Sequence, residues 1–153
     1  AVTRAVHDRY DASRRNPWNE VECGDHYARS MASYGVFLGA CGFAYHGPEG
    51  RIGFSPRLAS EKFKAAFTSA EGWGSYQQEI ADKVLKAEIA VKYGSLLVNT
   101  LVLTSPQGAG MTSLSLTGKD VAWTQEFSEG KVRITLADPV RISAGEILRV
   151  TVS

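Results

Sequence analysis

The residues best equipped for chemistry lie close together between positions 18 and 29. They supply an indole, three carboxylates, an imidazole and a guanidinium: Trp18, Glu20, Glu22, Asp25, His26 and Arg29. Carboxylates and arginine hold hydroxyl groups through charge-assisted hydrogen bonds, each contributing about 1.5–3 kcal/mol. An aromatic ring can cover the apolar face of a sugar. The residue types therefore allow a carbohydrate-binding site.

Two other interpretations of this cluster stay open. Asp25 and Arg29 are four residues apart, so on a helix they would form an exposed ion pair that contributes a few tenths of a kcal/mol. Glu22 and His26 have a spacing that a metal ion could use, but no second His or Cys shares their face. The sequence therefore predicts no metal site and no cofactor.

A helix predicted from Glu20 to Tyr45 must position this cluster. Between Met31 and Tyr45 it carries no charged residue. A helix that is apolar all round is buried on every side, and one of about 15 residues is too short to span a membrane. The only other helix candidate, Lys62–Ala70, is short. We therefore expect the predicted helix to require more neighbours than this sequence provides, and the sequence to belong to a larger protein.

The second half of the sequence predicts strands. Apolar and polar residues alternate over 85–92, 113–117 and 131–136, and turn residues separate these segments, as in Gly118-Lys119-Asp120. Six or seven short strands of this kind indicate an antiparallel sandwich or sheet. We expect two packed parts, residues 1–75 and residues 76–153, in an α+β arrangement.

Composition excludes several classes of protein. The sequence is 44% apolar and 22% charged with a net charge of +1, which indicates a globular chain and gives no support to nucleic-acid binding. No apolar run is long enough for a transmembrane segment. Cys23 and Cys41 would be roughly 27 Å apart along a helix, too far for a disulfide. Two free thiols favour a reducing compartment such as the cytoplasm.

The chemically rich segment also resembles a known family. The run NPWNEVECGDHYARSMAS at 16–33 is similar to a motif of glycoside hydrolase family 116, which includes β-glucosidases and the non-lysosomal glucosylceramidase. The runs CGFAYHGP at 41–48 and GWGSY at 72–76 continue the similarity. It extends over about residues 14–80, whereas the strand-rich tail resembles the family only in pattern.

The resemblance implies a retaining β-glycosidase whose catalytic domain is an (α/α)6 barrel, with residues 1–75 as its last helical segment. Glu20 and Arg29 match residues that hydrogen-bond glucose hydroxyls in the −1 subsite. Trp18, Glu22, Asp25 and His26 match the motif in supporting positions. The catalytic nucleophile and acid/base would lie upstream, so this chain holds no catalytic residue and should be inactive alone. Its partners would be a β-glucoside and the rest of the catalytic polypeptide.

Glu20 and Glu22 are not expected to be the catalytic pair. A retaining glycosidase holds its two carboxyl groups about 5–5.5 Å apart on opposite sides of the scissile bond. Residues that flank the same short segment cannot readily approach the sugar from two sides. We therefore assign Glu20 to orienting the substrate, with Arg29 as a bidentate donor whose charge keeps Glu20 ionised.

A second hypothesis is a non-catalytic carbohydrate-binding or assembly module built on the strands. Alternating strands follow Trp73, and Tyr93 and Trp123 are interpreted as exposed aromatic residues. Trp73, between two glycines, is interpreted as a packed residue at a turn rather than as a ligand platform. In the simpler interpretation the strands cover a neighbouring domain and bind nothing.

Overall fold

A computed structural model describes residues 1–15, 31–107, 109–110 and 112–153. Its contacts divide the chain into two units, Ala1–Gly39 and Ala40–Ser153, which are described separately. The first unit contains α1 (Val2–His7), the short 3-10 helix η1 (Ala12–Arg14) and most of α2 (Met31–Cys41). No helix in these described ranges is both long and apolar enough to cross a membrane.

The helix α2 ends earlier than the sequence predicts. Gly42 follows it with φ +55°, a left-handed conformation typical of the residue after a helix. A Cβ at Gly42 would lie 2.0 Å from the Ser55 carbonyl oxygen, so only glycine fits. The chain then enters β1 (Ala44–His46), which overlaps the end of the helix that the sequence predicts. The helix expected to continue to Tyr45 is therefore wrong over its last turn.

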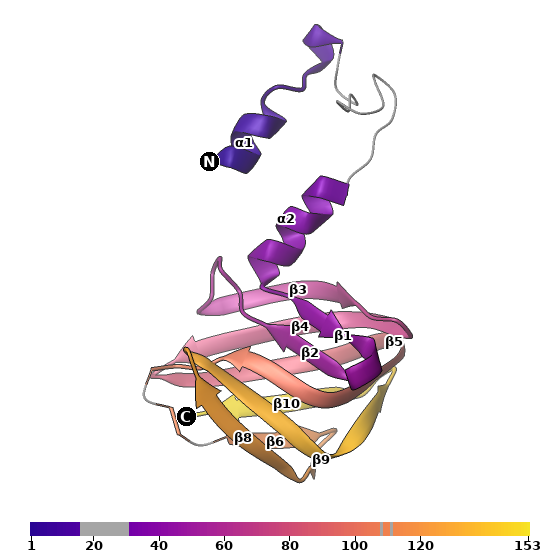
Figure 1. The fold of residues 1–153 in the computed structure, drawn as a ribbon, viewed down its shortest axis with the longest axis vertical. Helices are drawn as coiled ribbons and strands as arrows, with labels where there is room; N and C mark the ends of the chain where they lie inside the picture. The colour runs from indigo at the N-terminus through magenta and orange to yellow at the C-terminus, as the bar shows by residue number, and fades with distance from the viewer. Residues whose placement is uncertain (16–30, 108, 111) are drawn as a thin grey trace. The chain divides into compact units, whose positions relative to one another are not determined.

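The second unit is built almost entirely of strands (Figure 1). After β1 come the 3-10 helix η2 (Gly47–Glu49), β2 (Arg51–Phe54), β3 (Lys62–Thr68), β4 (Gly72–Ala81), β5 (Val84–Thr104), β6 (Thr112–Leu116), β7 (Lys119–Asp120), β8 (Trp123–Ser128), β9 (Lys131–Ser143) and β10 (Ile147–Val152). The predicted alternation at 85–92 and 131–136 lies within β5 and β9.

The long strand β5 joins the two halves of one curled sheet. Its first half pairs with β4 and β10, and its second half pairs with β9 and, in parallel, with β2. The strand bends at Gly94, which has φ +68°. The sequence pattern predicts two separate strands here, at 85–92 and 96–104, because the alternation ends near Gly94 as it would at a turn.

Both halves of the sheet contribute to one apolar core. From β5 alone, Leu85, Ile89, Leu101 and Leu103 are fully buried. The ring of Phe54 on β2 stacks on that of Tyr76 on β4, with centroids 3.9 Å apart and planes 1° from parallel. Alternate residues face inward within each regular stretch, as expected of a sheet with one wet face, and on β5 the inward set changes from the odd-numbered residues of 85–91 to Leu96 and Val98 and again to Leu101 and Leu103.

The predicted fold class is wrong. The chain is 57% strand and 16% helix, and the described residues contain two short α-helices and no helical segment of an (α/α)6 barrel. Three strands and the start of β4 lie within residues 1–75, the part predicted to be helical. Residues 62–68 alternate between exposed and more buried positions and pair with β4, so their period is that of a strand.

Candidate functional site

The residues that the sequence singles out for sugar binding lie outside the described residues. This applies to Trp18, Glu20, Glu22, Asp25, His26 and Arg29 alike. Their assignment stays a prediction from the sequence. The structure does describe the helix that follows them directly, and it describes a second group of polar and aromatic residues on the β unit.

The helix α2, which begins two residues after Arg29, exposes large apolar side chains. Tyr34, Val36 and Phe37 are 48%, 46% and 38% exposed, and the rings of Tyr34 and Phe37 stack with centroids 6.2 Å apart. Gly35 and Gly39 leave open space, because a Cβ built on either would meet nothing within 4 Å. The described part of the chain therefore leaves this apolar surface largely in water.

The end of α2 is held more firmly. Cys41 is buried and free, and burial raises the pKa of its thiol. The backbone N–H of Arg57 donates to the Ala40 carbonyl at 2.9 Å, and that of Ser55 donates to the Gly42 carbonyl at 3.1 Å. These bonds fix the last turn of the helix, while the turns nearer the predicted sugar-binding motif remain exposed.

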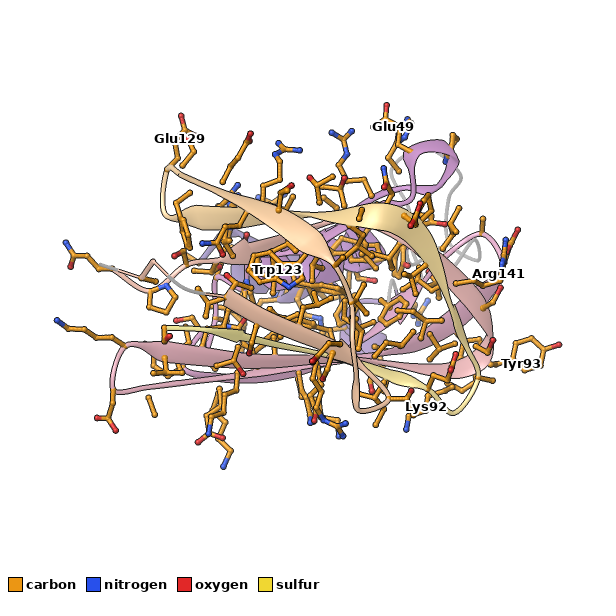
Figure 2. All side chains as sticks on the ribbon, turned by 90° about the horizontal axis from the view of Figure 1, so that it is seen from below. Glu49, Lys92, Tyr93, Trp123, Glu129 and Arg141 are labelled. Carbon is orange, nitrogen blue, oxygen red and sulfur yellow. The ribbon has the colours of Figure 1, made fainter. Side chains whose placement is uncertain are left out.

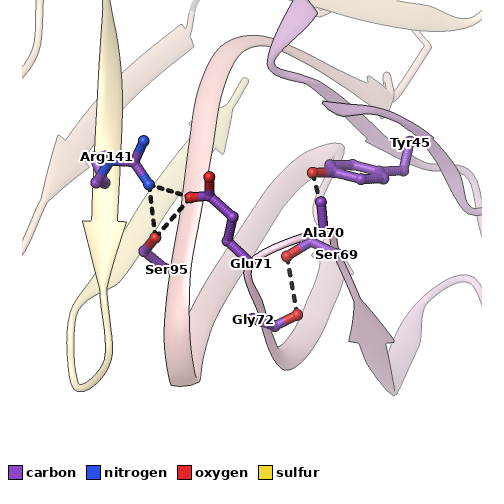
Figure 3. Close-up of polar contacts among 7 residues, drawn as sticks. All are labelled: Tyr45, Ser69, Ala70, Glu71, Gly72, Ser95 and Arg141. Carbon is purple, nitrogen blue, oxygen red and sulfur yellow. Dashed lines mark hydrogen bonds and ion pairs between the residues drawn. The ribbon is translucent and has the colours of Figure 1, made fainter. Parts of the chain in front are cut away.

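The second group of residues surrounds the turn between β3 and β4 (Figure 3). Within this turn, the Ser69 N–H and hydroxyl both donate to the Gly72 carbonyl, at 2.8 and 2.9 Å. The Ala70 N–H donates to the Tyr45 hydroxyl at 3.3 Å. The Ser95 N–H donates to the Glu71 carbonyl at 3.1 Å. The turn is therefore anchored from β1 and from β5 as well as internally.

The anchored turn presents a carboxylate to an arginine from a distant strand. Arg141 on β9 pairs with the Glu71 carboxylate and donates to the Ser95 hydroxyl at 2.8 Å, and this hydroxyl donates to Glu71 at 3.2 Å. Two hydrogen bonds lower the pKa of Glu71 below its usual 4.5, and the bond from Arg141 has a larger effect than the bond from Ser95. Arg141 and Glu71 are 70 residues apart, so no local pattern in the sequence could have predicted this pair.

Two glycines make this arrangement possible. Gly72 and Gly94 are partners in the β4–β5 register. A Cβ on Gly72 would lie 2.4 Å from the Tyr93 carbonyl oxygen, and one on Gly94 would lie 2.0 Å from the Glu71 carbonyl oxygen. The two paired strands can therefore approach closely at Gly94, which brings Glu71 to Ser95.

Directly beside the ion pair, two aromatic side chains face solvent. Trp73 and Tyr93 are partners across β4 and β5, and they are 50% and 67% exposed. Trp73 was expected to be packed at a turn, but it lies in β4 with its side chain half in water. Figure 2 shows Tyr93 projecting from the end of the β unit at which Arg141 also lies.

Trp123, the other aromatic residue predicted to be exposed, is only partly so. It packs against the core of the β unit, and in Figure 2 it lies over the interior of the sheet rather than beyond its edge. Among the described residues of the β unit, Trp73 and Tyr93 are thus the exposed aromatic residues that are partners across two strands.

No family model matches this sequence, and no curated protein was found to match it.

Proposed function

We propose that this chain supplies glucose-binding residues to a retaining β-glycosidase. In this proposal Glu20 and Arg29 hold hydroxyl groups of the sugar whose bond is broken. The nucleophile and the acid/base belong to polypeptide outside these 153 residues. The motif at 16–33 supports the assignment of the two side chains, as the resemblance implies.

The structural observation that carries the proposal is the exposed apolar surface of α2. The helix follows the motif directly, and its large side chains Tyr34, Val36 and Phe37 are exposed in the described chain. Contiguous exposed apolar surface is typical of sites that contact protein, membrane or ligand, and in this proposal other protein covers it. Further catalytic polypeptide that packed on α2 would also lie beside the motif that binds the sugar.

The chemistry required of the two residues differs. A planar guanidinium donates two parallel hydrogen bonds, so Arg29 is suited to hold neighbouring hydroxyl groups in one orientation. A carboxylate accepts hydrogen bonds from hydroxyl groups, and the positive charge of Arg29 would favour its ionised form. Glu20 would therefore orient the sugar while the catalytic carboxylates act on the anomeric carbon.

The test compares the 153-residue chain with the longer polypeptide that the proposal requires, using an aryl β-glucoside as substrate. We expect no turnover from the chain and activity from the longer protein. In the longer protein, Arg29→Ala should lower kcat/KM at least tenfold, which corresponds to about 1.4 kcal/mol of transition-state stabilisation. Arg57→Ala is the matched control, because Arg57 is an exposed arginine outside the motif.

A fluorinated glucoside that traps the covalent intermediate separates binding from bond breaking. Peptide mapping should place the labelled carboxylate outside residues 1–153. Robust turnover by the isolated chain, a label on Glu20 or Glu22, or unchanged kinetics in Arg29→Ala would each contradict the proposal.

A further inference from the structure

The aromatic pair Trp73–Tyr93 and the ion pair Glu71–Arg141 come from adjacent positions where β4 meets β5, with Arg141 reaching them from β9. Glu71 precedes Trp73 by two residues, and Ser95 follows Tyr93 by two residues. Because Gly72 and Gly94 are register partners, Trp73 and Tyr93 lie opposite each other on one side of this glycine pair along the strands, and Glu71 lies against Ser95 on the other. Arg141 connects to this group from β9.

We propose that this surface binds a neutral pyranose ring of a carbohydrate. Here we call it the Trp73 surface, and it consists of Glu71, Trp73, Tyr93, Ser95 and Arg141. The inference goes beyond the proposed function, because it assigns carbohydrate binding to the β unit and does not depend on Glu20 or Arg29.

The aromatic residues suit the apolar face of such a ring. Side chains of directly opposed residues in an antiparallel pair have Cβ atoms about 4.5–5.5 Å apart, so Trp73 and Tyr93 can contact the same small ligand. Neither residue takes part in the ring–ring contacts found among the described residues, such as Phe54–Tyr76. Their rings are thus available to a ligand rather than used in the core.

The polar residues suit the hydroxyl groups at the edge of the ring. Glu71 offers a carboxylate that accepts hydrogen bonds, and Arg141 offers a guanidinium that donates them; their side chains are 59% and 52% exposed. The two charges compensate each other, which favours a neutral ligand over an anion. The anchored turn holds Glu71 in position before any ligand arrives, so little ordering is needed on binding.

The size of the surface favours a sugar over a protein partner. Aromatic side chains bury about 150–250 Å² each when fully covered, and Trp73 and Tyr93 are about half to two-thirds exposed. A stable protein interface takes about 800 Å² from each partner. The neighbouring positions on the outer face of β4 are polar, Ser75 and Gln77, so the apolar area does not extend along the sheet.

The experiment is calorimetric titration of the 153-residue chain with cellobiose, cellotriose and maltotriose. We expect dissociation constants of about one millimolar for at least one of them, since a ligand of two or three sugar rings makes few contacts. Trp73→Ala and Tyr93→Ala should each weaken this binding about tenfold, and Arg141→Ala should weaken it less. Phe127→Ala is the matched control, because Phe127 is an exposed aromatic on β8.

Circular dichroism and thermal unfolding establish that each variant is folded. The double variant Glu20→Gln, Arg29→Ala should bind as well as the unaltered chain, so a failure of the proposed glycosidase role leaves this result unchanged. If that double variant lost the binding while Trp73→Ala kept it, the sugar would bind at the motif and the inference would be wrong.

Two further outcomes would overturn the inference. One is the absence of heat change with all three saccharides up to tenfold above the expected dissociation constants. The other is dimerisation of the chain in sedimentation that Trp73→Ala abolishes, which would identify the surface as a contact between copies.

Discussion

The rings of Phe54 and Tyr76 lie parallel, 3.9 Å apart, in the core of the β unit. Phe54 comes from β2 and Tyr76 from β4, strands that pair with opposite halves of β5. The contact therefore joins the two halves of the curled sheet. Tyr76 brings a polar group into this core, and its hydroxyl donates to the Gln78 side-chain oxygen at 2.6 Å.

Tyr76→Phe should reduce the free energy of unfolding by about 1–3 kcal/mol, because it leaves the Gln78 oxygen buried without its donor. The Gln78 amide would keep its bond to the Ser60 carbonyl, at 2.6 Å, so the loss is confined to one hydrogen bond. Urea unfolding of the chain measures the difference. Tyr93→Phe, at an exposed position, should change the stability by less than about 0.5 kcal/mol; an equal effect of the two changes would contradict the argument.

The buried phenol of Tyr76 should also make the free energy of unfolding decrease at alkaline pH. Burial raises the pKa of its phenol above the usual 10.0. The unfolded chain therefore loses this proton at a pH where the folded chain keeps it, so the stabilisation is complete below pH 10 and is lost as the pH rises further. Unfolding midpoints measured between pH 8 and 11.5 should fall above pH 10 more steeply for the unaltered chain than for Tyr76→Phe.

Glu71 should titrate below 4.5, because Arg141 and then Ser95 donate hydrogen bonds to its carboxylate. Because this pKa is lower in the folded than in the unfolded chain, the ionised carboxylate stabilises the folded state above about pH 4.5, and this stabilisation is lost as the pH falls. In a nuclear magnetic resonance titration, Arg141→Ala should raise the pKa of Glu71 more than Ser95→Ala does.

Arg133→Ala is the charge-matched control for this titration, because Arg133 is an exposed arginine on the same strand as Arg141. It should leave the pKa of Glu71 nearly unchanged. A pKa of 4.5 or more in the unaltered chain would show that the ion pair does not form in solution.

Part of this fold could be predicted from the sequence, and the reasons for the failures are physical. Strict alternation marks residues 131–136 of β9 and the first half of β5, because one face of each segment is buried and the other is wet. The segment 62–68 alternates too, but its helix-forming lysines and alanines leave the type of element ambiguous. The apolar run at 31–45 predicts a longer helix than forms, since the close approach of Ser55 to Gly42 is a tertiary contact.

The Trp73 surface could be predicted only in part. The exposure of Tyr93 does not follow from the alternation, which would place residue 93 on the same face as the buried Ile89 and Val91; it depends on the register shift that leaves Lys92 without a partner on β4. The pairing of Trp73 with Tyr93 depends on the register of β4 against β5, including the bulge beside Trp73. The contact of Glu71 with Arg141 requires β4 and β9 both to pair with β5, and no spacing rule covers it. Glu20 and Arg29 were singled out from the motif, and their positions stay predictions.

Gly94→Ala should destabilise the β unit by at least about 2 kcal/mol. The new methyl group would lie 2.0 Å from the Glu71 carbonyl oxygen and would also occupy a backbone conformation with φ +68°. Gly118→Ala separates the two causes, because Gly118 has φ +81° but open space around its Cβ position. That control should cost about 1 kcal/mol. Equal urea midpoints for the two variants would show that Gly94 does not lie this close to the Glu71 carbonyl.

Gly35 and Gly39 on α2 offer a test of whether other protein covers this helix. Among the described residues a methyl group at either position meets nothing within 4 Å, so in the 153-residue chain Gly35→Ala and Gly39→Ala should each stabilise the helix by about 0.5–1 kcal/mol through backbone entropy alone. In the longer polypeptide that the glycosidase proposal requires, neighbouring segments would approach the glycines closely, and the same methyl groups would create overlap costing about 1–3 kcal/mol. In the 153-residue chain, both the helix content measured by circular dichroism and the melting temperature should therefore rise. In the longer protein, the melting temperature should fall. A melting temperature that rises in both proteins would mean that α2 stays uncovered in the longer one, and the structural support for the proposal would be lost.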